Sequence, residues 1–479
     1  MVFSSLTFLC VFLPVVLILD RVLSGIRARN VLLLMASLLF YAYGEPVCVF
    51  IMVLSCLLNY VWAMLIGKCQ DKSKAGLSKL VVALSVIQNL AVLGVYKYAD
   101  FAIRTVNGIT GLAIKPTGIV MPIGISFFTF QAMSYVIDVY RKDCKVQKNP
   151  FNVMLYVSFF PQLVAGPIVK YHDIELEITN RKETPEETAN GISRFVCGLA
   201  KKVFIANYTA AIADALFGAP QSQIGALSAW TGAIAYMLQI YFDFSAYSDM
   251  AVGLGLMFGF HFKENFNYPY VSTSVREFWR RWHISLSTWF KEYLYIPLGG
   301  NRKGKARTVI NKFIVFLATG FWHGANWTFI FWGLYHGIFQ MIEEYVRPLF
   351  GKIKNGKGIN TKEKAKPDPV LTLLGHIYAV LVVLVGFVFF RADTLTQGFF
   401  WVREMFAGAF TSTPETALAN VTLLLPLMTP LNICVLVCGI ILSAPVKEKL
   451  QKYQALQKLS RIVTPLLLIL CIINLAGGT

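Results

Sequence analysis

Histidines inside apolar sequence are the residues of this chain that could most readily do chemistry. His323 lies in residues 313–346, where almost every other side chain is apolar. An imidazole has an unperturbed pKa near neutrality, so it can accept and return a proton at physiological pH. Ionisable groups inside a membrane are costly and functional by default, and Trp322 and Asn326 beside His323 add shape and hydrogen-bonding groups. We therefore predict a functional role for His323, although a buried histidine used only for packing is the simpler alternative.

The same apolar stretch contains a second histidine, His336. It follows His323 by 13 positions, which puts the two on roughly opposite faces of a continuous helix at about 100° per residue. A structural role is therefore favoured for His336.

A third histidine, His283, lies in a short amphipathic segment, residues 276–291. Its polar residues recur at steps of three and four, which predicts one shared helical face made by Arg276, Arg280, His283, Ser287 and Lys291. The other side is apolar and aromatic, with Phe278, Trp282, Leu286, Trp289 and Phe290. This pattern predicts an interfacial helix whose basic face meets the cytosol or a polar cavity, where His283 could also be merely solvated.

Two carboxylates, Asp243 and Asp249, lie inside another apolar stretch. They are six positions apart, so they lie on opposite faces of one helix and are not expected to act as a paired acid and base. Either could pair with an arginine or cap an interhelical hydrogen bond, and either could instead orient an imidazole or hold a cavity open.

The elements that carry these residues are predicted to be membrane helices. The chain has 479 residues, of which 56% are hydrophobic, and apolar runs recur along its length. The formal net charge of +18 would suggest nucleic acid binding in a soluble protein. Here the basic residues lie in short loops between apolar runs, so membrane topology explains them better. The chain is predicted to be all-α and polytopic, with about 10 to 12 spans in one membrane-embedded domain, residues 1–479.

The stretch that contains His323 is too long for one span and is predicted to be a hairpin of two short helices. Its break is expected near residues 323–326. Both flanks are basic, at residues 301–307 and in the lysine- and glycine-rich loop 351–368, so both ends are expected to be cytoplasmic. Residues 151–170 are flanked by basic loops and interrupted by prolines, which predicts a re-entrant segment. Single spans are expected at 371–390 and 423–442.

Other kinds of chemistry lack a sequence signature. The nine cysteines include no Cys-x-x-Cys pair, so neither a zinc site nor a disulfide framework is expected. No Gly-x-Ser-x-Gly elbow, P-loop or His-Glu-x-x-His pattern accompanies the histidines, and no metal is expected.

Four motifs resemble the signature of the membrane-bound O-acyltransferase superfamily. They are residues 161–167 (PQLVAGP), 241–245 (YFDFS), 276–283 (REFWRRWH) and 321–333 (FWHGANWTFIFWG). Their order and detail are most similar to the bacterial branch that O-acetylates alginate, peptidoglycan and related polymers. In that family the histidine that matches His323 is essential, and a second important histidine matches His283. The resemblance also implies a ring of tilted helices around a thinned centre, where a cytoplasmic funnel meets an outer one.

The implied chemistry is acyl transfer from a thioester, with acetyl-CoA as the expected donor arriving from the cytosol. Arg276, Arg280 and Lys291 would meet its phosphates. His323 would take the proton of an acceptor hydroxyl, or stabilise its attack, and later protonate the leaving thiolate, with His283 orienting or assisting. The resemblance further implies an extracytoplasmic partner protein or polysaccharide as acceptor, and the bacterial cytoplasmic membrane as location.

Two other functions remain open on sequence alone. Within the same superfamily, the chain could transfer D-alanine from a carrier protein to teichoic acid. Outside it, the chain could be a transporter with a proton-relay histidine, although no repeat-related pair of broken helices favours this.

Overall fold

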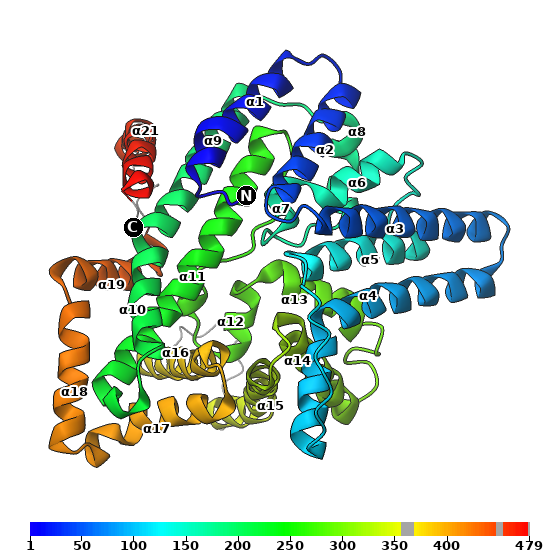
Figure 1. Ribbon diagram of the computed structural model, residues 1–479. Coiled ribbons are helices and arrows are strands. Elements are labelled where there is room, and N and C mark those ends of the chain that lie inside the picture. Colours follow the sequence, from blue (N-terminus) through cyan, green and yellow to red (C-terminus); the bar gives the residue numbers. More distant parts are fainter. Residues whose placement is uncertain (356–367, 447–453, 478–479) are drawn as a thin grey trace. The chain divides into compact units, whose positions relative to one another are not determined.

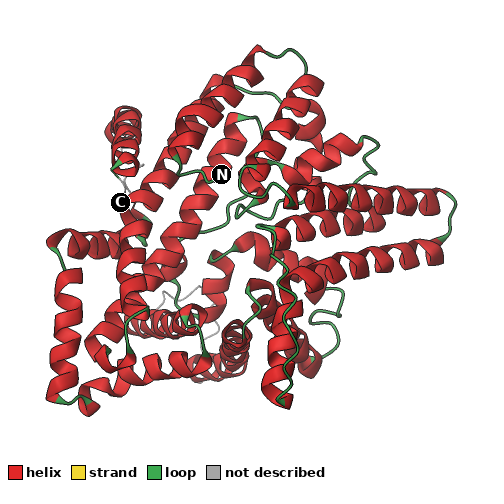
Figure 2. Ribbon diagram, viewed as in Figure 1, coloured by secondary structure: helices red, strands yellow, loops and turns green. Residues whose placement is uncertain are grey.

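The computed structural model of the protein describes residues 1–355, 368–446 and 454–477. Within this part every regular element is a helix (Figures 1 and 2), which confirms the predicted all-α class. Most of the predicted loop 351–368 lies outside the described residues. The described chain divides into two compact units, so the single domain expected from the sequence stays a prediction.

The first unit consists of residues 1–200, 244–264 and the chain from 460 onward. Its helices are η1 (Phe8–Phe12), α1 (Leu13–Val22), α2 (Ile26–Ala42), α3 (Cys48–Asp71), α4 (Ala75–Thr110), α5 (Ile125–Arg141), α6 (Pro150–Ser158), α7 (Phe160–Leu163), α8 (Tyr171–Asn180), α9 (Pro185–Lys201) and most of α21 (Gln454–Ala476). The helices α3, α4 and α5 lie alongside one another (Figure 1).

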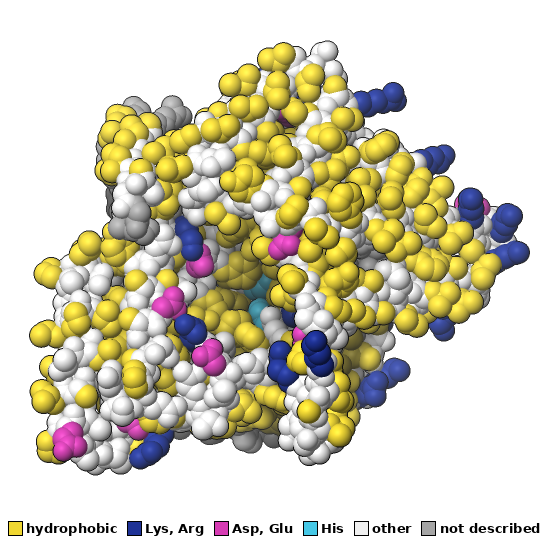
Figure 3. All heavy atoms as spheres, viewed as in Figure 1, with side chains coloured by type: hydrophobic (Ala, Val, Ile, Leu, Met, Phe, Trp, Pro, Cys, Tyr) yellow, Lys and Arg dark blue, Asp and Glu magenta, His cyan; other side chains and the backbone are white. Residues whose placement is uncertain are grey.

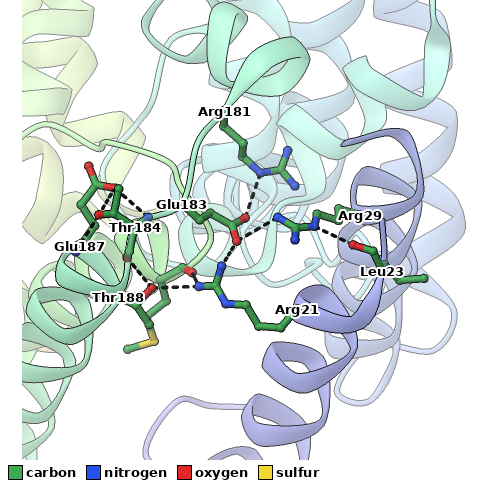
Figure 4. A network of polar contacts seen from close by, with 9 residues as sticks. Arg21, Leu23, Arg29, Arg181, Glu183, Thr184, Glu187 and Thr188 are labelled. Atoms are coloured by element: carbon green, nitrogen blue, oxygen red, sulfur yellow. Dashed lines mark hydrogen bonds and ion pairs between the residues drawn. The ribbon is translucent and has the colours of Figure 1, made fainter. Parts of the chain in front are cut away.

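Glu183, whose side chain is almost fully buried, is the centre of a group of ion pairs in the first unit (Figure 4). Arg21 of α1 pairs with one carboxylate oxygen, Arg29 of α2 reaches the same oxygen at 3.1 Å, and Arg181 lies 3.6 Å from the other. Arg21 also donates to the hydroxyl of Thr188 on α9 at 2.9 Å. Because breaking a buried charge pair leaves an uncompensated charge, this network fixes α1 and α2 to the start of α9.

The predicted re-entrant segment, residues 151–170, is indeed interrupted. It consists of α6, the single turn α7 and irregular backbone as far as Lys170, and its side chains from Val153 to Leu163 are buried. The Tyr156 hydroxyl donates to the carbonyl of Val169 at 2.9 Å, which ties the returning chain to α6. Irregular backbone of this kind is tolerated at membrane depth only when it is packed in protein.

The second unit consists of residues 201–243 and 265–459. Its helices are η2 (Lys202–Ala206), α10 (Asn207–Phe217), η3 (Gln221–Gln223), η4 (Pro269–Val271), α12 (Val275–Arg281), α13 (Ile284–Phe290), η5 (Lys291–Tyr295), α14 (Lys305–His323), α15 (Trp327–Asn355), α16 (Pro369–Arg391), α17 (Leu395–Thr411), α18 (Pro414–Leu424), η6 (Leu425–Leu427) and α19 (Pro430–Leu442). The long helix α11 (Ala226–Met257) contributes residues to both units.

The predicted hairpin is formed by α14 and α15, which lie side by side (Figure 1). A Cβ atom on Gly320 would lie 2.5 Å from the carbonyl oxygen of Phe329, and one on Gly333 would lie 2.4 Å from that of Phe316. Only glycine permits so close an approach of two helix backbones. His323 is the last residue of α14 and Trp327 is the first of α15, which confirms the predicted break.

The span predicted at 423–442 is not one continuous helix. The helices over 414–427 and 430–442 meet there at a bend of 84°. Pro430 opens α19, and the residue before a proline is disfavoured in helical conformation, so the helix cannot continue through it. The sequence also does not predict α17, because Gln397, Arg403 and Glu404 interrupt its apolar run.

Several helices of the described residues have the length and composition of membrane spans. Four pass as single helices, namely α3, α4, the run Pro185–Phe217 and α16, and the bent pair at 414–442 raises the number to five. Large hydrophobic side chains such as Phe50 and Leu54 are exposed on α3, and Figure 3 shows hydrophobic side chains over much of the face drawn. The expected total of about 10 to 12 spans is higher than this and stays a prediction.

Candidate functional site

His323 ends α14 at the break of the hairpin and is half-buried among aromatic rings of the second unit. Its ring centroid lies 5.0 Å from that of Trp322, 5.0 Å from that of Trp332 and 5.1 Å from that of Phe390. All three rings meet the imidazole edge-on, at 87°, 84° and 77°. The packing therefore fixes the orientation of the imidazole.

The prediction that residues 276–291 form one helix is wrong. The chain forms α12, breaks at Trp282 and His283, and resumes as α13 and the π-helical turn η5. Backbone hydrogen bonds from Asn267 N to Arg281 O and from Ile284 N to Asn265 O, both 2.9 Å, draw the chain out of helical conformation. His283 has a φ of 43°, in the left-handed region that residues other than glycine rarely adopt. Strain of this kind often accompanies function.

His283 is also 1% exposed, so it does not belong to a solvated basic face. Its Nδ1 lies 3.2 Å from Oδ1 of Asn265. The same oxygen accepts from the backbone N–H of Ser285 at 3.1 Å and from its hydroxyl at 2.9 Å, which identifies the atom as the carbonyl oxygen. Nδ1 must therefore carry the proton, which makes Nε2 the basic nitrogen of the neutral ring. Burial, together with the nearby His323, lowers the pKa of His283 well below its usual value.

The structure brings His283 and His323 to the same place. The Trp322 ring contacts both imidazoles, with centroid distances of 5.8 Å to His283 and 5.0 Å to His323. The two histidines are also close enough to interact electrostatically. Two imidazoles around one indole, one half-buried and one locked in a single tautomer, can together move protons and hold a polar reactant.

Arg276, Arg280 and Lys291, the predicted donor-binding residues, are all exposed in the second unit. Arg276 and Arg280 lie on α12, and Lys291 begins η5, so the break at His283 separates them. Glu343 of α15 accepts from the backbone N–H groups of Val275 and Arg276 at 2.5 and 2.9 Å, which anchors α12 to the hairpin. Because the side chains of Arg276, Arg280 and Lys291 are exposed, they are available to an anion, although the three do not share one helical face.

Asp243 and Asn326, predicted as supporting residues, have different roles from each other. Asp243 pairs with Lys202 at 2.7 Å, which matches the ion-pairing alternative except that the partner is a lysine. Asn326 Nδ2 donates to the carbonyl of Asp393 at 2.9 Å, and its Oδ1 accepts from Thr328 N at 3.2 Å. Asn326 therefore caps α15 and ties the hairpin turn next to His323 to the chain after α16.

Sequence reasoning missed Asn265, which sets the tautomer of His283, and Glu343, which anchors α12. Neither lies in a motif, and each acts on residues far from it in sequence, so no local pattern could indicate them. Among the residues that the structure describes, no group of three or more His, Cys, Asp or Glu side chains could hold a metal ion. A metal-independent site stays a prediction.

Known proteins that are similar to this chain belong to the superfamily that the four sequence motifs resemble. The family model of the membrane-bound O-acyltransferase (MBOAT) family matches residues 48–357. The probable alginate O-acetylase AlgI of Pseudomonas aeruginosa is 43% identical over 426 residues, which cover 88% of this chain and 78% of that protein. The peptidoglycan O-acetyltransferase of Helicobacter pylori is 38% identical over 370 residues, covering 71% and 69%. The teichoic acid D-alanyltransferase of Bacillus subtilis is 27% identical over 242 residues, covering 47% and 59%.

These matches bear out the resemblance on which the site residues were chosen. With the apolar helices, they identify a multi-pass membrane protein and an acyltransferase. The chain belongs to the membrane-bound O-acyltransferase family.

Proposed function

We propose that this protein is an O-acetyltransferase of the bacterial cytoplasmic membrane. It takes an acetyl group from cytosolic acetyl-CoA and passes it across the membrane to a hydroxyl of an extracytoplasmic acceptor, either a partner protein or a cell-surface polysaccharide. The observation that carries the proposal is the meeting of His283 and His323 at Trp322, in a family of acyltransferases. The names of the relatives that cover most of this chain support acetyl as the group and a polysaccharide as the acceptor.

In the proposed reaction His323 acts as general base and then as general acid. It takes the proton of the acceptor hydroxyl as the oxygen attacks the thioester carbonyl, and it returns that proton to the sulfur when the carbon–sulfur bond breaks. The new ester and the free thiol then balance the thioester and alcohol consumed. His283, held as the Nδ1–H tautomer by Asn265, can accept a hydrogen bond at Nε2 and orient a reactant.

The two rival functions have less support. The teichoic acid D-alanyltransferase of Bacillus subtilis covers 47% of this chain, whereas the alginate O-acetylase of Pseudomonas aeruginosa covers 88%. Membership of an acyltransferase family argues against a protein that only transports.

A donor comparison tests the proposed function. The purified protein in lipid nanodiscs is offered labelled acetyl-CoA or a labelled D-alanyl carrier protein, together with alginate or peptidoglycan fragments and a membrane extract as a source of acceptors. We expect labelled acetyl esters from acetyl-CoA and no labelled D-alanyl esters from the D-alanyl carrier protein. Transfer from the carrier alone would reassign the protein to D-alanylation, and release of label from neither donor would contradict the proposed function.

Charge reversal at Arg280 tests the donor side. Arg280 is exposed on α12, and a charge-assisted hydrogen bond to a phosphate contributes about 1.5–3 kcal/mol, so Arg280→Glu should raise KM for acetyl-CoA by roughly ten- to hundredfold. The saturated rate should change much less, because a phosphate far from the carbonyl is held alike in the ground state and the transition state. Steady-state kinetics separates the two effects.

The matched control is Arg403→Glu, a charge reversal at an exposed arginine of α17. It should leave KM for acetyl-CoA near the parent value. If Arg280→Glu lowers only the saturated rate, Arg280 supports the structure and does not contact the donor.

A further inference from the structure

A group of charged side chains lies in the second unit where the ends of α10 and α16 meet the hairpin turn. Arg391, the last residue of α16, pairs with Asp214 of α10 at 2.7 Å. Two residues after Arg391, the carbonyl of Asp393 accepts a hydrogen bond from Nδ2 of Asn326 in the turn at 2.9 Å. The three charged residues Asp214, Arg391 and Asp393 are here called the turn-side cluster.

Buried rings fix the position of the Arg391 guanidinium. It lies 5.4 Å from the ring centroid of Phe217, which stacks on Trp401 with centroids 3.7 Å apart. Gln397 of α17 joins the two halves of the cluster, because it accepts from the backbone N–H of Asp393 at 2.8 Å and donates to the carbonyl of Phe217 at 3.2 Å. The cluster is therefore held in place by α10, α16, α17 and the hairpin turn.

The charged groups of the cluster are accessible from outside the packed unit. The side chain of Arg391 is 27% exposed and that of Asp214 is 59% exposed, and Asp393 is exposed as well. The contact between Arg391 and Asp214 engages one nitrogen of a guanidinium that has five N–H groups, and one of two carboxylate oxygens. Because exposed ion pairs contribute little to stability, stabilisation of the fold is a weak reason for this one.

The cluster lies beside His323. The ring of Phe390, the residue before Arg391, has its centroid 5.1 Å from that of the imidazole. Phe390 also contacts Phe329 of α15, with centroids 4.8 Å apart, so the end of α16 packs against the hairpin on both sides of its turn. A molecule bound to the cluster would therefore have its hydroxyl groups near the proposed general base.

The cluster and the proposed donor residue Arg276 lie at different ends of the hairpin. The start of α12, with Arg276, is bound to Glu343, which lies about 24 Å along α15 from Trp327 at 1.5 Å per residue. In addition, α16 has the length and composition of a membrane span and follows the loop 351–368, which is predicted to be cytoplasmic. Arg391 at the other end of α16 is therefore expected on the extracytoplasmic side.

We propose that Asp214, Arg391 and Asp393 bind a sugar ring of the acceptor polysaccharide, an inference that rests on the proposed function. A sugar hydroxyl both donates and accepts, so carboxylates together with a guanidinium match neighbouring hydroxyls of one ring. Trp327, directly after Asn326 in the turn, is 50% exposed and offers an indole face to the C–H groups of the sugar. Uronates and N-acetylhexosamines share these groups, so a polymer of either kind would bind in this way.

Binding of labelled oligosaccharides to the protein in lipid nanodiscs tests the inference. The probes are fluorescent oligomers of mannuronate and of N-acetylglucosamine, and we expect one of the two to bind. Arg391→Gln and Asp393→Asn should each weaken that binding by roughly ten- to hundredfold, the worth of one hydrogen bond to a charged group. KM for the same oligosaccharide in acetyl transfer should rise equally, while KM for acetyl-CoA stays at the parent value and shows that each variant is folded.

Two controls separate sugar binding from support of the fold. Glu344→Gln removes a partly exposed carboxylate that pairs with Lys312 on the same hairpin, far from its turn, and should leave the affinity for both oligosaccharides unchanged. Asp214→Arg combined with Arg391→Asp keeps an ion pair between α10 and α16 but moves the guanidinium from α16 to α10. This exchange should bind as weakly as Arg391→Gln. Binding at the parent affinity would overturn the inference, because the pair would then serve only to hold the helices together.

The remaining outcomes separate this inference from the proposed function. Cluster variants that bind and acetylate the oligosaccharide as the parent protein does would overturn the sugar site and leave acetyl transfer intact. Transfer to a protein of the membrane extract, with no oligosaccharide bound, would also overturn the sugar site and would identify a partner protein as the acceptor. Cluster-dependent binding of an oligosaccharide, without transfer from acetyl-CoA to any acceptor, would support the sugar site and contradict the proposed function.

Discussion

Replacing His323 with alanine is expected to abolish acetyl transfer while the protein still inserts into the membrane. The imidazole lies at the break of the α14–α15 hairpin, held edge-on by Trp322, Trp332 and Phe390. Losing a general base typically costs about 10²- to 10⁴-fold in rate. The loss should appear in kcat and in kcat/KM alike, because the proton moves only in the transition state. Transfer of labelled acetyl to acceptor, measured in nanodiscs, gives both constants.

Two further variants separate chemistry from packing at His323. His323→Gln keeps a planar polar group of similar size but cannot take up a proton, and it should be nearly as inactive as His323→Ala. His261→Ala removes an imidazole from the surface of the first unit, where it is 51% exposed between Glu177 and Glu187, and should keep parent activity. A monodisperse His323→Ala protein with near-parent transfer would contradict the assignment of His323.

The hairpin and His323 could be predicted because the signals are local. An apolar run longer than one span, basic flanks and a Gly–Ala–Asn turn together indicate two helices with a break, and the structure has that break at residues 324–326. A histidine inside such an apolar run is energetically costly, so it is a candidate functional residue even when the fold is not known.

The surroundings of His283 could not be predicted, because they depend on long-range contacts. Helical periodicity placed His283 on an exposed basic face, but backbone pairing with residues 265–267 breaks the helix and turns the imidazole inward. The paired residues are distant in sequence, and the side-chain contact between His283 and Asn265 likewise spans 18 positions. The predicted basic face was right for the exposure of Arg276, Arg280 and Lys291, and wrong in including His283 and in being a single helix.

The surroundings of His336 also could not be predicted from helical periodicity. Counting 100° per residue across the turn assumed a continuous helix, but the hairpin reverses the chain between the two histidines. Trp332 therefore contacts both His323 and His336, which the sequence alone placed on opposite faces. Periodicity is informative within an element and fails where the chain turns.

Transfer across the membrane is the second large effect that we expect. The predicted cytoplasmic flanks of the hairpin put its turn, with His323, away from the side from which the donor arrives. The buried, interrupted segment 151–170 provides irregular backbone of the kind that is tolerated beside a cavity or within protein. Donor thioester and acceptor hydroxyl would then reach His323 from opposite faces, with the hydroxyl within about 3 Å of a ring nitrogen.

Sealed proteoliposomes test this directly. Labelled acetyl-CoA is enclosed with the cytoplasmic face of the protein, and a hydroxyl-bearing acceptor is present only outside. Label should appear on the external acceptor, should depend on His323 and should be unaffected by excess unlabelled acetate outside, which would dilute any label that crossed as free acetate. A second preparation with acceptor enclosed beside the donor serves as the comparison. A site that is open to both faces of the membrane must be able to acetylate an acceptor that is present only outside. If label reaches only the enclosed acceptor, the protein therefore transfers acetyl on one side of the membrane, and the proposed transfer across the membrane is wrong.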